Sequence, residues 1–157
     1  MSDALAARNF LGPAGEEAIE SVHDMLDDLW SEVPLTQDID RMTFTTAVIE
    51  SASNVVQHAE PVGEEPVKLG VVITVRHTVL EARVSALHAK PPYGGMVPVM
   101  PEDDAESGRG LALIQALVTT VIFERQDGTN TWVLSRGYSQ DRPLPDSRAD
   151  SGVRPPP

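Results

Sequence analysis

The stretch "VKLGVVITVRHTVLEARVSAL", residues 67–87, decides the fold class. Branched apolar residues dominate both of its halves, and each half is short, so residues 67–77 and 79–87 favour β-strands paired as a hairpin. A sheet with one apolar face must pack that face against another layer. The neighbouring segments therefore have to supply helices or a second sheet.

Two helices are predicted upstream of the hairpin. The first covers residues 16–32, ends before Pro34, and has acidic residues between the apolar positions of one face. Those positions are Ile19, Val22, Leu26, Leu29 and Trp30.

The second helix is predicted to begin at Asp38 as its N-cap and to end near Ala59, before Pro61 and Gly63.

The downstream half begins with an irregular segment, residues 88–107, which is rich in proline and glycine. A loop of that length inside a domain is usually functional or disordered. A third helix is predicted over 110–118. Two further strands are predicted over 120–125 and 130–136, joined by the turn signal "QDGT".

The predicted fold class is therefore α+β, a two-layer α/β sandwich whose mostly antiparallel sheet is covered by three helices. Residues 1–136 form the predicted domain. Residues 137–157 are rich in proline and poor in large apolar side chains, so we expect a disordered Pro-rich tail.

Charge and composition limit the function. The net charge is −12, and residues 1–60 hold 12 acidic and 2 basic residues. Such a chain repels phosphate backbones, so direct nucleic-acid binding is not expected. The acidic excess serves as a solubilising surface or as a contact for a basic protein. The chain lacks cysteine, a signal-like N-terminus and any apolar run near the roughly 20 residues of a membrane span, so we expect a cytoplasmic protein without membrane contact.

A polar stripe marks the second predicted helix. In "AVIESASNVVQHAE", residues 47–60, Glu50 and Asn54 stand one turn apart, and an apolar side lies opposite them. An amide oxygen suits Mg²⁺, and a carboxylate can take a proton from a hydroxyl that attacks a phosphate. On their own, these two residues fit an ordinary solvated helix face better.

A glycine-flanked arginine precedes the third predicted helix, in "ESGRGLALIQAL", residues 106–117. Gly108, Arg109 and Gly110 could place the free N–H groups of a helix start against a phosphate. A flexible hinge before a helix explains the same residues equally well.

The order of these motifs resembles the GHKL (histidine kinase-like) ATPase superfamily, and within it the anti-sigma factor serine kinases. "TFTTAVIESASNVVQHA", residues 43–59, is similar to their N box. "ESGRGLALIQALVTTVIFERQDGTNTWVLSR", residues 106–136, is similar to their second glycine box and closing strands. The resemblance covers roughly residues 10–136.

The resemblance implies roles for the matching residues. Glu50 would be the general base, and Asn54 would be the Mg²⁺ ligand and a contact to the bound nucleotide. Gly108, Arg109 and Gly110 would hold the phosphates of ATP, and residues 88–107 would form a lid. The implied partners are a sigma factor and an anti-anti-sigma factor, and a homodimer is left open.

The first glycine box of that family, Asp-x-Gly-x-Gly, is not preserved. In "RVSALHAKPPYGG", residues 83–95, Ala86 stands where the aspartate that recognises adenine belongs. His88 and Lys90 stand at the two glycine positions. Losing the acceptor costs about 1–3 kcal/mol of binding, so ATP binding, and with it Mg²⁺ binding, is put in doubt.

Two functions of different classes follow from the resemblance. The first is an anti-sigma regulatory factor that acts by protein–protein partner switching, with weakened or lost ATP binding. The alternative is an active ATP-dependent serine kinase that phosphorylates an anti-anti-sigma factor. The ATPase half of a sensor histidine kinase fits less well, because no phospho-accepting helix is found upstream.

Overall fold

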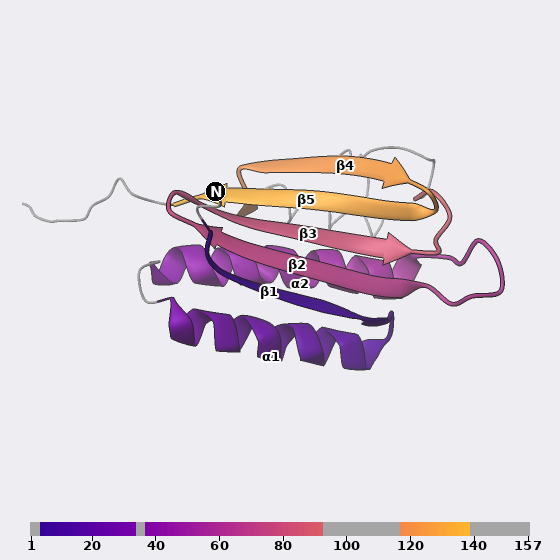
Figure 1. The fold of residues 1–157 in the computed structure, drawn as a ribbon, viewed down its shortest axis with the longest axis horizontal. Helices are drawn as coiled ribbons and strands as arrows, with labels where there is room; N and C mark the ends of the chain where they lie inside the picture. Colours follow the sequence, from indigo (N-terminus) through magenta and orange to yellow (C-terminus); the bar gives the residue numbers. More distant parts are fainter. Residues whose placement is uncertain (1–3, 34–36, 93–116, 139–157) are drawn as a thin grey trace, which may run out of the picture.

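The computed structural model describes residues 4–33, 37–92 and 117–138. These residues form five strands and two long helices (Figure 1). In chain order the elements are β1 (Ala4–Pro13), α1 (Glu16–Glu32), α2 (Asp38–His58), β2 (Lys68–Arg76), β3 (Val79–Leu87), β4 (Thr120–Gln126) and β5 (Thr129–Gly137).

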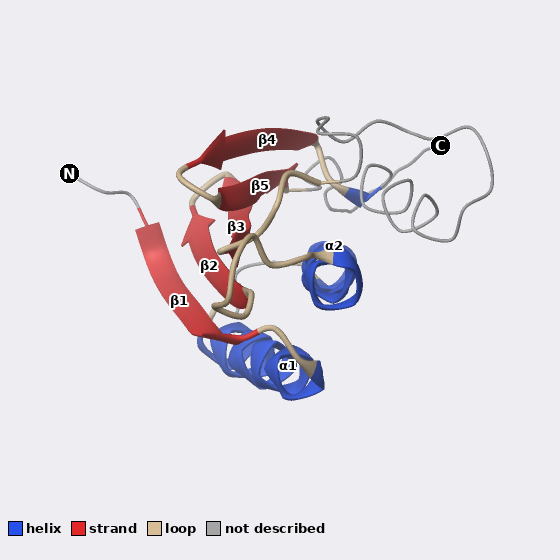
Figure 2. Cartoon of the chain, turned by 90° about the vertical axis from the view of Figure 1, so that its right-hand side faces the viewer, coloured by secondary structure: helices blue, strands red, loops and turns tan. Residues whose placement is uncertain are grey.

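The strands form one sheet in the order β1-β2-β3-β5-β4, and every neighbouring pair is antiparallel. Both helices lie on the same face of this sheet, with α1 below β1 and β2 and α2 along the middle strands (Figure 2). The predicted α+β sandwich is confirmed. Of the three predicted helices two are described, and most of the third, residues 110–118, lies outside the described residues.

The core lies between the sheet and the two helices. Alternate residues of β2 and β3 point into it, as the burial of Leu69, Val71, Val84 and Ala86 shows. On α1, the buried positions Val22, Leu26 and Leu29 form the apolar side that the sequence predicts. The opposite face of the sheet carries no helix among the described residues (Figure 2).

Strand β1 is not predicted by the sequence pattern. Its residues, "ALAARNFLGP", contain no β-branched side chain, so their local preference for a strand is low. Pairing with β2 in register, for example Phe10 with Val71, supplies the backbone hydrogen bonds that make this segment a strand. Tertiary pairing therefore overrides local propensity here.

Two boundaries in the structure differ from the predicted ones. Asp38 is the first residue of α2 and not its N-cap; the cap position is Gln37, which forms no side-chain capping bond. Gly137 ends β5, and the Tyr138 hydroxyl donates to the Arg76 carbonyl, so described structure extends to Tyr138. The division into residues 1–136 and a tail over 137–157 otherwise stays a prediction. Among the described helices, none is long and apolar enough to cross a membrane.

The β4–β5 turn gives the first testable prediction. Asp127 has φ 53° and Gly128 has φ 78°, so both central residues adopt the left-handed conformation of a type I′ turn. Gly128→Ala should lower the free energy of unfolding by about 1–2 kcal/mol, because a Cβ is disfavoured at that φ. Urea denaturation measures the loss.

Gly63→Ala is the matched control for this turn. A Cβ at Gly63 would meet no atom within 4 Å, and Gly63 is not among the residues with positive φ. Its free energy of unfolding should change by less than about 0.5 kcal/mol. Equal losses in both variants would contradict the assigned role of the turn.

Candidate functional site

Helix α2 presents the predicted polar stripe. Glu50 and Asn54 are half-buried, whereas Val48, Ala52 and Val55 are buried against the sheet. Within the described parts of the chain, neither the Glu50 carboxylate nor the Asn54 amide forms a hydrogen bond or ion pair with another described residue. No described residue therefore competes with a ligand for either group. Gly108, Arg109 and Gly110 lie outside the described residues, so the structure does not test their predicted role.

The other side of the candidate site is a row of residues across β3, β5 and β4. Ala86 pairs with Asn130, and Asn130 pairs with Arg125. Ala86 is 0% exposed and Asn130 is 2% exposed. Ala86 shares the inward-facing side of β3 with Val84, so the row belongs to the face that the helices cover.

Both ends of the Asn130 carboxamide are occupied. Its Nδ2 donates to the Lys90 carbonyl at 2.8 Å, and its Oδ1 accepts from Arg125 Nη1 at 2.6 Å. These two partners determine the orientation of the amide. In the flipped orientation, Nδ2 would face the Arg125 donor and Oδ1 would face the Lys90 carbonyl. The Asn130 oxygen already accepts a charged donor, so it is a poor replacement for the carboxylate that Ala86 lacks.

The segment that leaves β3 is held from two sides. The Ala89 N–H donates to the Gly128 carbonyl, and the Lys90 N–H donates to the Glu60 carbonyl. Arg125 Nη1 also reaches the Ala89 carbonyl at 2.9 Å. His88 has φ 62°, a conformation that favours glycine, which fits the implied placement of a family glycine at this position.

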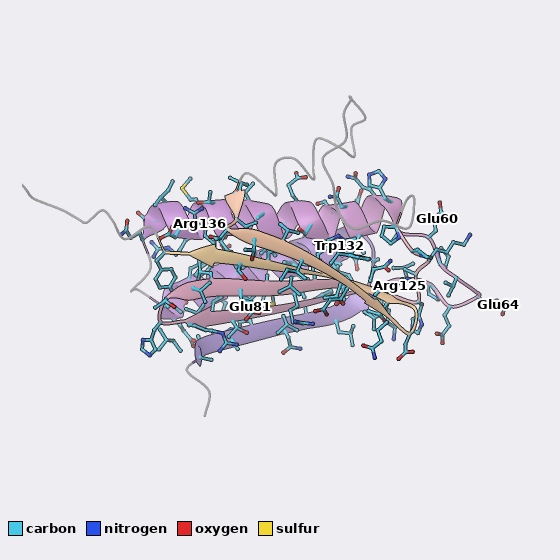
Figure 3. The ribbon with its side chains drawn as sticks, turned by 90° about the horizontal axis from the view of Figure 1, so that it is seen from above. Glu60, Glu64, Glu81, Arg125, Trp132 and Arg136 are labelled. Carbon is cyan, nitrogen blue, oxygen red and sulfur yellow. The ribbon has the colours of Figure 1, made fainter. Side chains whose placement is uncertain are left out.

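The far end of the site is anchored by a buried ion pair. Asp40, in the first turn of α2, is 0% exposed and accepts from Arg136 Nε at 3.0 Å. Arg136 Nη1 also donates to the Leu117 carbonyl at 2.9 Å, and Figure 3 shows Arg136 and Arg125 at opposite ends of the sheet. Burial raises the pKa of the Tyr138 hydroxyl, and the Asp40 carboxylate raises this pKa further. Arg136 thus ties the start of α2 to the chain that enters β4.

Sequence reasoning missed three polar groups of this face: Asp40, Asn130 and Ser51. The Ser51 hydroxyl is buried and has no hydrogen-bond partner in the described structure. A serine directly after Glu50, among apolar positions of the same helix, was the available signal. Partners that are distant in sequence, such as Arg136 for Asp40, left no signal in a single chain.

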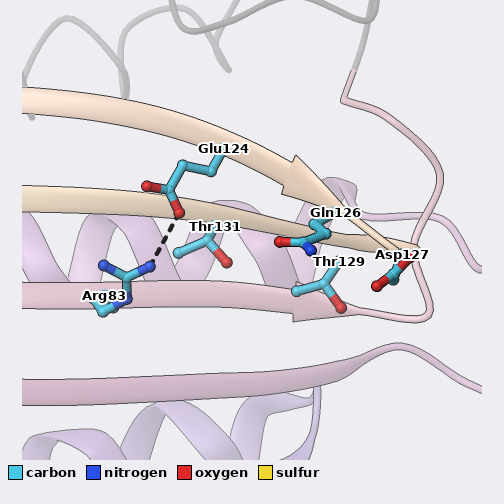
Figure 4. Close-up of a pocket in the computed structure, with 6 residues that line it drawn as sticks. All are labelled: Arg83, Glu124, Gln126, Asp127, Thr129 and Thr131. Carbon is cyan, nitrogen blue, oxygen red and sulfur yellow. Dashed lines mark hydrogen bonds and ion pairs between the residues drawn. The ribbon is translucent and has the colours of Figure 1, made fainter.

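A polar hollow lies on the open face of the sheet (Figure 4). It is lined by Arg83, Glu124, Gln126, Asp127, Thr129 and Thr131. Arg83 forms an exposed ion pair with Glu124 at 3.0 Å. Because these side chains point away from α2, the hollow is separate from the face that carries Glu50 and Asn54. Among the described residues, no group of three or more His, Asp and Glu side chains is placed to hold a metal ion.

Comparisons with known proteins agree with this arrangement. A family model described as a histidine kinase-like ATPase domain matches residues 13–136. The crystal structure of the RsbU and RsbW domains of Rv1364c from Mycobacterium tuberculosis is similar, with a TM-score of 0.64 and 17% identity. The match covers 92% of this chain and 35% of that chain, and at this identity it shows a shared fold. No curated protein matches the chain in sequence.

Proposed function

The chain belongs to the histidine kinase-like ATPase family, and from that premise we propose that it is an anti-sigma regulatory factor. It acts by protein–protein partner switching, with a sigma factor and an anti-anti-sigma factor as partners. Its ATP binding is weakened or lost. The resemblance of residues 43–59 and 106–136 to the anti-sigma factor serine kinases supports this choice within the family.

The observation that carries the proposal is the buried Ala86. Its methyl group lies where the resemblance places an adenine-binding carboxylate, and the polar neighbour across the strand, Asn130, is already hydrogen-bonded to Lys90 and Arg125. A bound adenine would leave its amino group without that acceptor, which lowers affinity by about ten- to hundredfold. A regulatory role that depends on protein contacts survives such a loss, whereas efficient ATP turnover does not.

ATP and Mg²⁺ are the ligands that the family implies in general, and the described residues fit them in part. Asn54 offers an amide oxygen, and Glu50 a carboxylate, both half-buried and without partners among the described residues. These are the hard oxygen groups that suit Mg²⁺. When bound, Mg-ATP would supply the phosphoryl group. Among the described residues, the fit fails at the base end, where Ala86 stands in place of an acceptor.

Calorimetric titration of the full chain with Mg-ATP and Mg-GTP tests the weakened nucleotide site. We expect weak binding and affinities within about tenfold of each other, because the adenine-specific acceptor is missing. In parallel, the chain is tested for binding to purified sigma and anti-anti-sigma factors. Tight, adenine-selective binding would overturn the weakened-site proposal, and failure to bind any of these proteins would overturn the regulatory role.

Glu50 and Asn54 on α2, which have no partner among the described residues, support a second candidate, the serine kinase. In that reaction Glu50 would take the proton of the attacking hydroxyl, and Asn54 would hold Mg²⁺. Glu50→Ala should lower phosphoryl transfer to an anti-anti-sigma factor by about 10²–10⁴-fold while leaving the fold intact. Asn54→Ala should remove the Mg²⁺ dependence of nucleotide binding.

Transfer of radiolabelled phosphate from ATP measures this activity. Glu17→Ala, which removes an exposed carboxylate of α1, is the matched control and should transfer phosphate at the parent rate. If Glu50→Ala also matches the parent, Glu50 is not the general base. If the parent itself transfers no phosphate, the kinase is excluded and the regulatory factor stands alone.

The outer side of α1 is the predicted contact for a basic partner. Arg8 pairs with Asp28 at 3.0 Å and with Glu32 at 2.7 Å, which offsets these two acids. Glu20, Asp24 and Asp27 are exposed on the same helix. Their field should steer a basic protein toward α1.

Association with a bound sigma or anti-anti-sigma factor should therefore slow as salt rises. Asp24→Lys should slow it further, by about three- to tenfold at low salt, whereas Glu64→Lys, at an exposed loop position, should not. Stopped-flow or surface-based kinetics measure the association rate. Equal effects of the two reversals would leave the α1 surface as a solubilising face.

A further inference from the structure

Ser51 carries a polar atom that the described structure leaves without a partner. The residue is 5% exposed, and its Oγ forms no hydrogen bond in the described part of the chain. A helical serine usually faces solvent or returns its hydroxyl to the carbonyl four residues earlier, and Ser51 does neither. A buried hydroxyl of this kind is normally satisfied by a ligand or by ordered water.

The position of Ser51 along α2 places it near Ala86. At one end, Asp40 is bonded to Arg136, whose partner on β3 is Leu80. Eleven residues of helix carry the chain about 16 Å from Asp40 to Ser51. Six residues of strand carry it about 20 Å from Leu80 to Ala86.

The other end of α2 is fixed as well. Val62 follows α2 and His88 follows β3. The Val62 N–H donates to the His88 carbonyl, so the C-terminal ends of the helix and the strand lie side by side. Val48, Ala52 and Val55 surround Ser51 on the helix surface and are buried with it. The Ser51 hydroxyl therefore lies in the layer between α2 and the sheet, within one helical turn of the level of Ala86.

We propose that Ser51 is the residue that contacts the purine base, in place of the missing aspartate. This inference rests on the proposed function, in which the face between α2 and β3 is a weakened nucleotide site. The polar group would then lie on the facing helix and not on the strand. Ala86 is apolar where the family pattern has a carboxylate, and Ser51 supplies a hydroxyl from α2.

The chemistry of a hydroxyl determines which bases fit. A serine hydroxyl can donate one hydrogen bond and accept others, whereas a carboxylate only accepts. Adenine has a donating amino group at the ring position where guanine has an accepting carbonyl. Ser51 can pair with either, so the ligand class is a purine nucleoside triphosphate without strong choice between adenine and guanine.

The burial of Ser51 also explains why such binding would be weak. The hydroxyl is covered in the structure, so a base reaches it only after local opening, and the cost of opening lowers the apparent affinity. A bond to a neutral hydroxyl is also weaker than one to a carboxylate.

Calorimetric titration of the full chain with three Mg-nucleotides tests the proposal: ATP, GTP and purine riboside triphosphate, which lacks the substituent at that ring position. Ser51→Ala should weaken ATP and GTP binding by about three- to tenfold and leave purine riboside triphosphate unchanged. Ser53→Ala, which removes a half-buried hydroxyl from the same helix, should leave all three unchanged.

Thermal unfolding without nucleotide gives the second readout. Ser51→Ala removes a buried hydroxyl that has no partner in the described structure, so the melting temperature of the variant should equal the parent value or exceed it by about 2–6 °C. A hydroxyl with a purely structural role would instead lower the melting temperature and leave nucleotide affinity unchanged.

The outcomes separate this inference from the proposed function. Equal losses for all three nucleotides, no loss for any, or a parent that binds no nucleotide would each overturn the role of Ser51. None of these results bears on binding to a sigma or anti-anti-sigma factor, whose failure would overturn the regulatory function alone.

Discussion

Arg136→Met should lower the free energy of unfolding by about 3–5 kcal/mol, the usual cost of removing one partner of a buried ion pair. Asp40 is 0% exposed and accepts from Arg136 Nε, and Arg136 Nη2 lies 3.0 Å from the same oxygen. The variant also loses the bond from Arg136 to the Leu117 carbonyl. Methionine fills much of the volume of the arginine stem, so the loss reports charge and hydrogen bonding more than packing.

Arg83→Met is the matched control, because Arg83 and Glu124 form an ion pair on the same sheet with side chains 46% and 52% exposed. An exposed pair contributes at most about 1 kcal/mol. Urea denaturation of both variants gives the two losses. If Arg136→Met costs no more than Arg83→Met, the buried pair is not a major support of the fold.

A double-mutant cycle with Asp40→Asn separates the pair from its surroundings. Both Asp40 and Arg136 take part in further interactions, so single losses include more than the bond between them. We expect Asp40→Asn to recover part of the stability of Arg136→Met, because it removes the buried charge. The pair also matters for the site, since it fixes the start of the helix that carries Glu50 and Asn54.

The parts of the fold with a strong local pattern could be predicted from the sequence. Helix α1 has its buried residues at helical spacing and occupies the predicted residues 16–32. The β2–β3 hairpin follows from branched apolar residues, and the β4–β5 turn from an Asp-Gly pair. In each case the residues that determine the element lie within the element itself.

The parts that depend on distant partners could not be predicted. Strand β1 forms because β2 offers a free edge, which the residues of β1 do not reveal. The roles of Asn130 and Asp40 depend on groups 40 and 96 residues away. On the candidate site, the Glu50–Asn54 face was predicted from helical spacing, whereas Gly108, Arg109 and Gly110 fall outside the described residues and stay predictions.

Ala86→Asp should destabilise the protein in the absence of nucleotide, and its stability should then depend on bound ATP. The new carboxylate would occupy a position that is 0% exposed, and an uncompensated buried charge costs about 3–5 kcal/mol. If the base end of the nucleotide site lies at Ala86, the amino group of adenine supplies the missing donor. Mg-ATP should then bind about ten- to hundredfold more tightly than it binds the parent, and Mg-GTP should not.

Ala82→Asp provides the control, because Ala82 is also 0% exposed and faces the same side of β3, four residues earlier. It should lose stability similarly, and ATP should not restore it. Thermal unfolding with and without each nucleotide measures the effect, since saturation at about 100 times the Kd adds roughly 2.7 kcal/mol.

Ala86→Asn, which adds an acceptor without a charge, covers the case in which the aspartate variant does not fold. If ATP stabilises Ala86→Asp and Ala86→Asn no more than it stabilises Ala82→Asp, the base does not lie beside β3 at this position. The nucleotide assignment of the whole face would then fail, because both Ala86 and the facing Ser51 were placed at the base end of the site, and the fold would serve protein contacts alone.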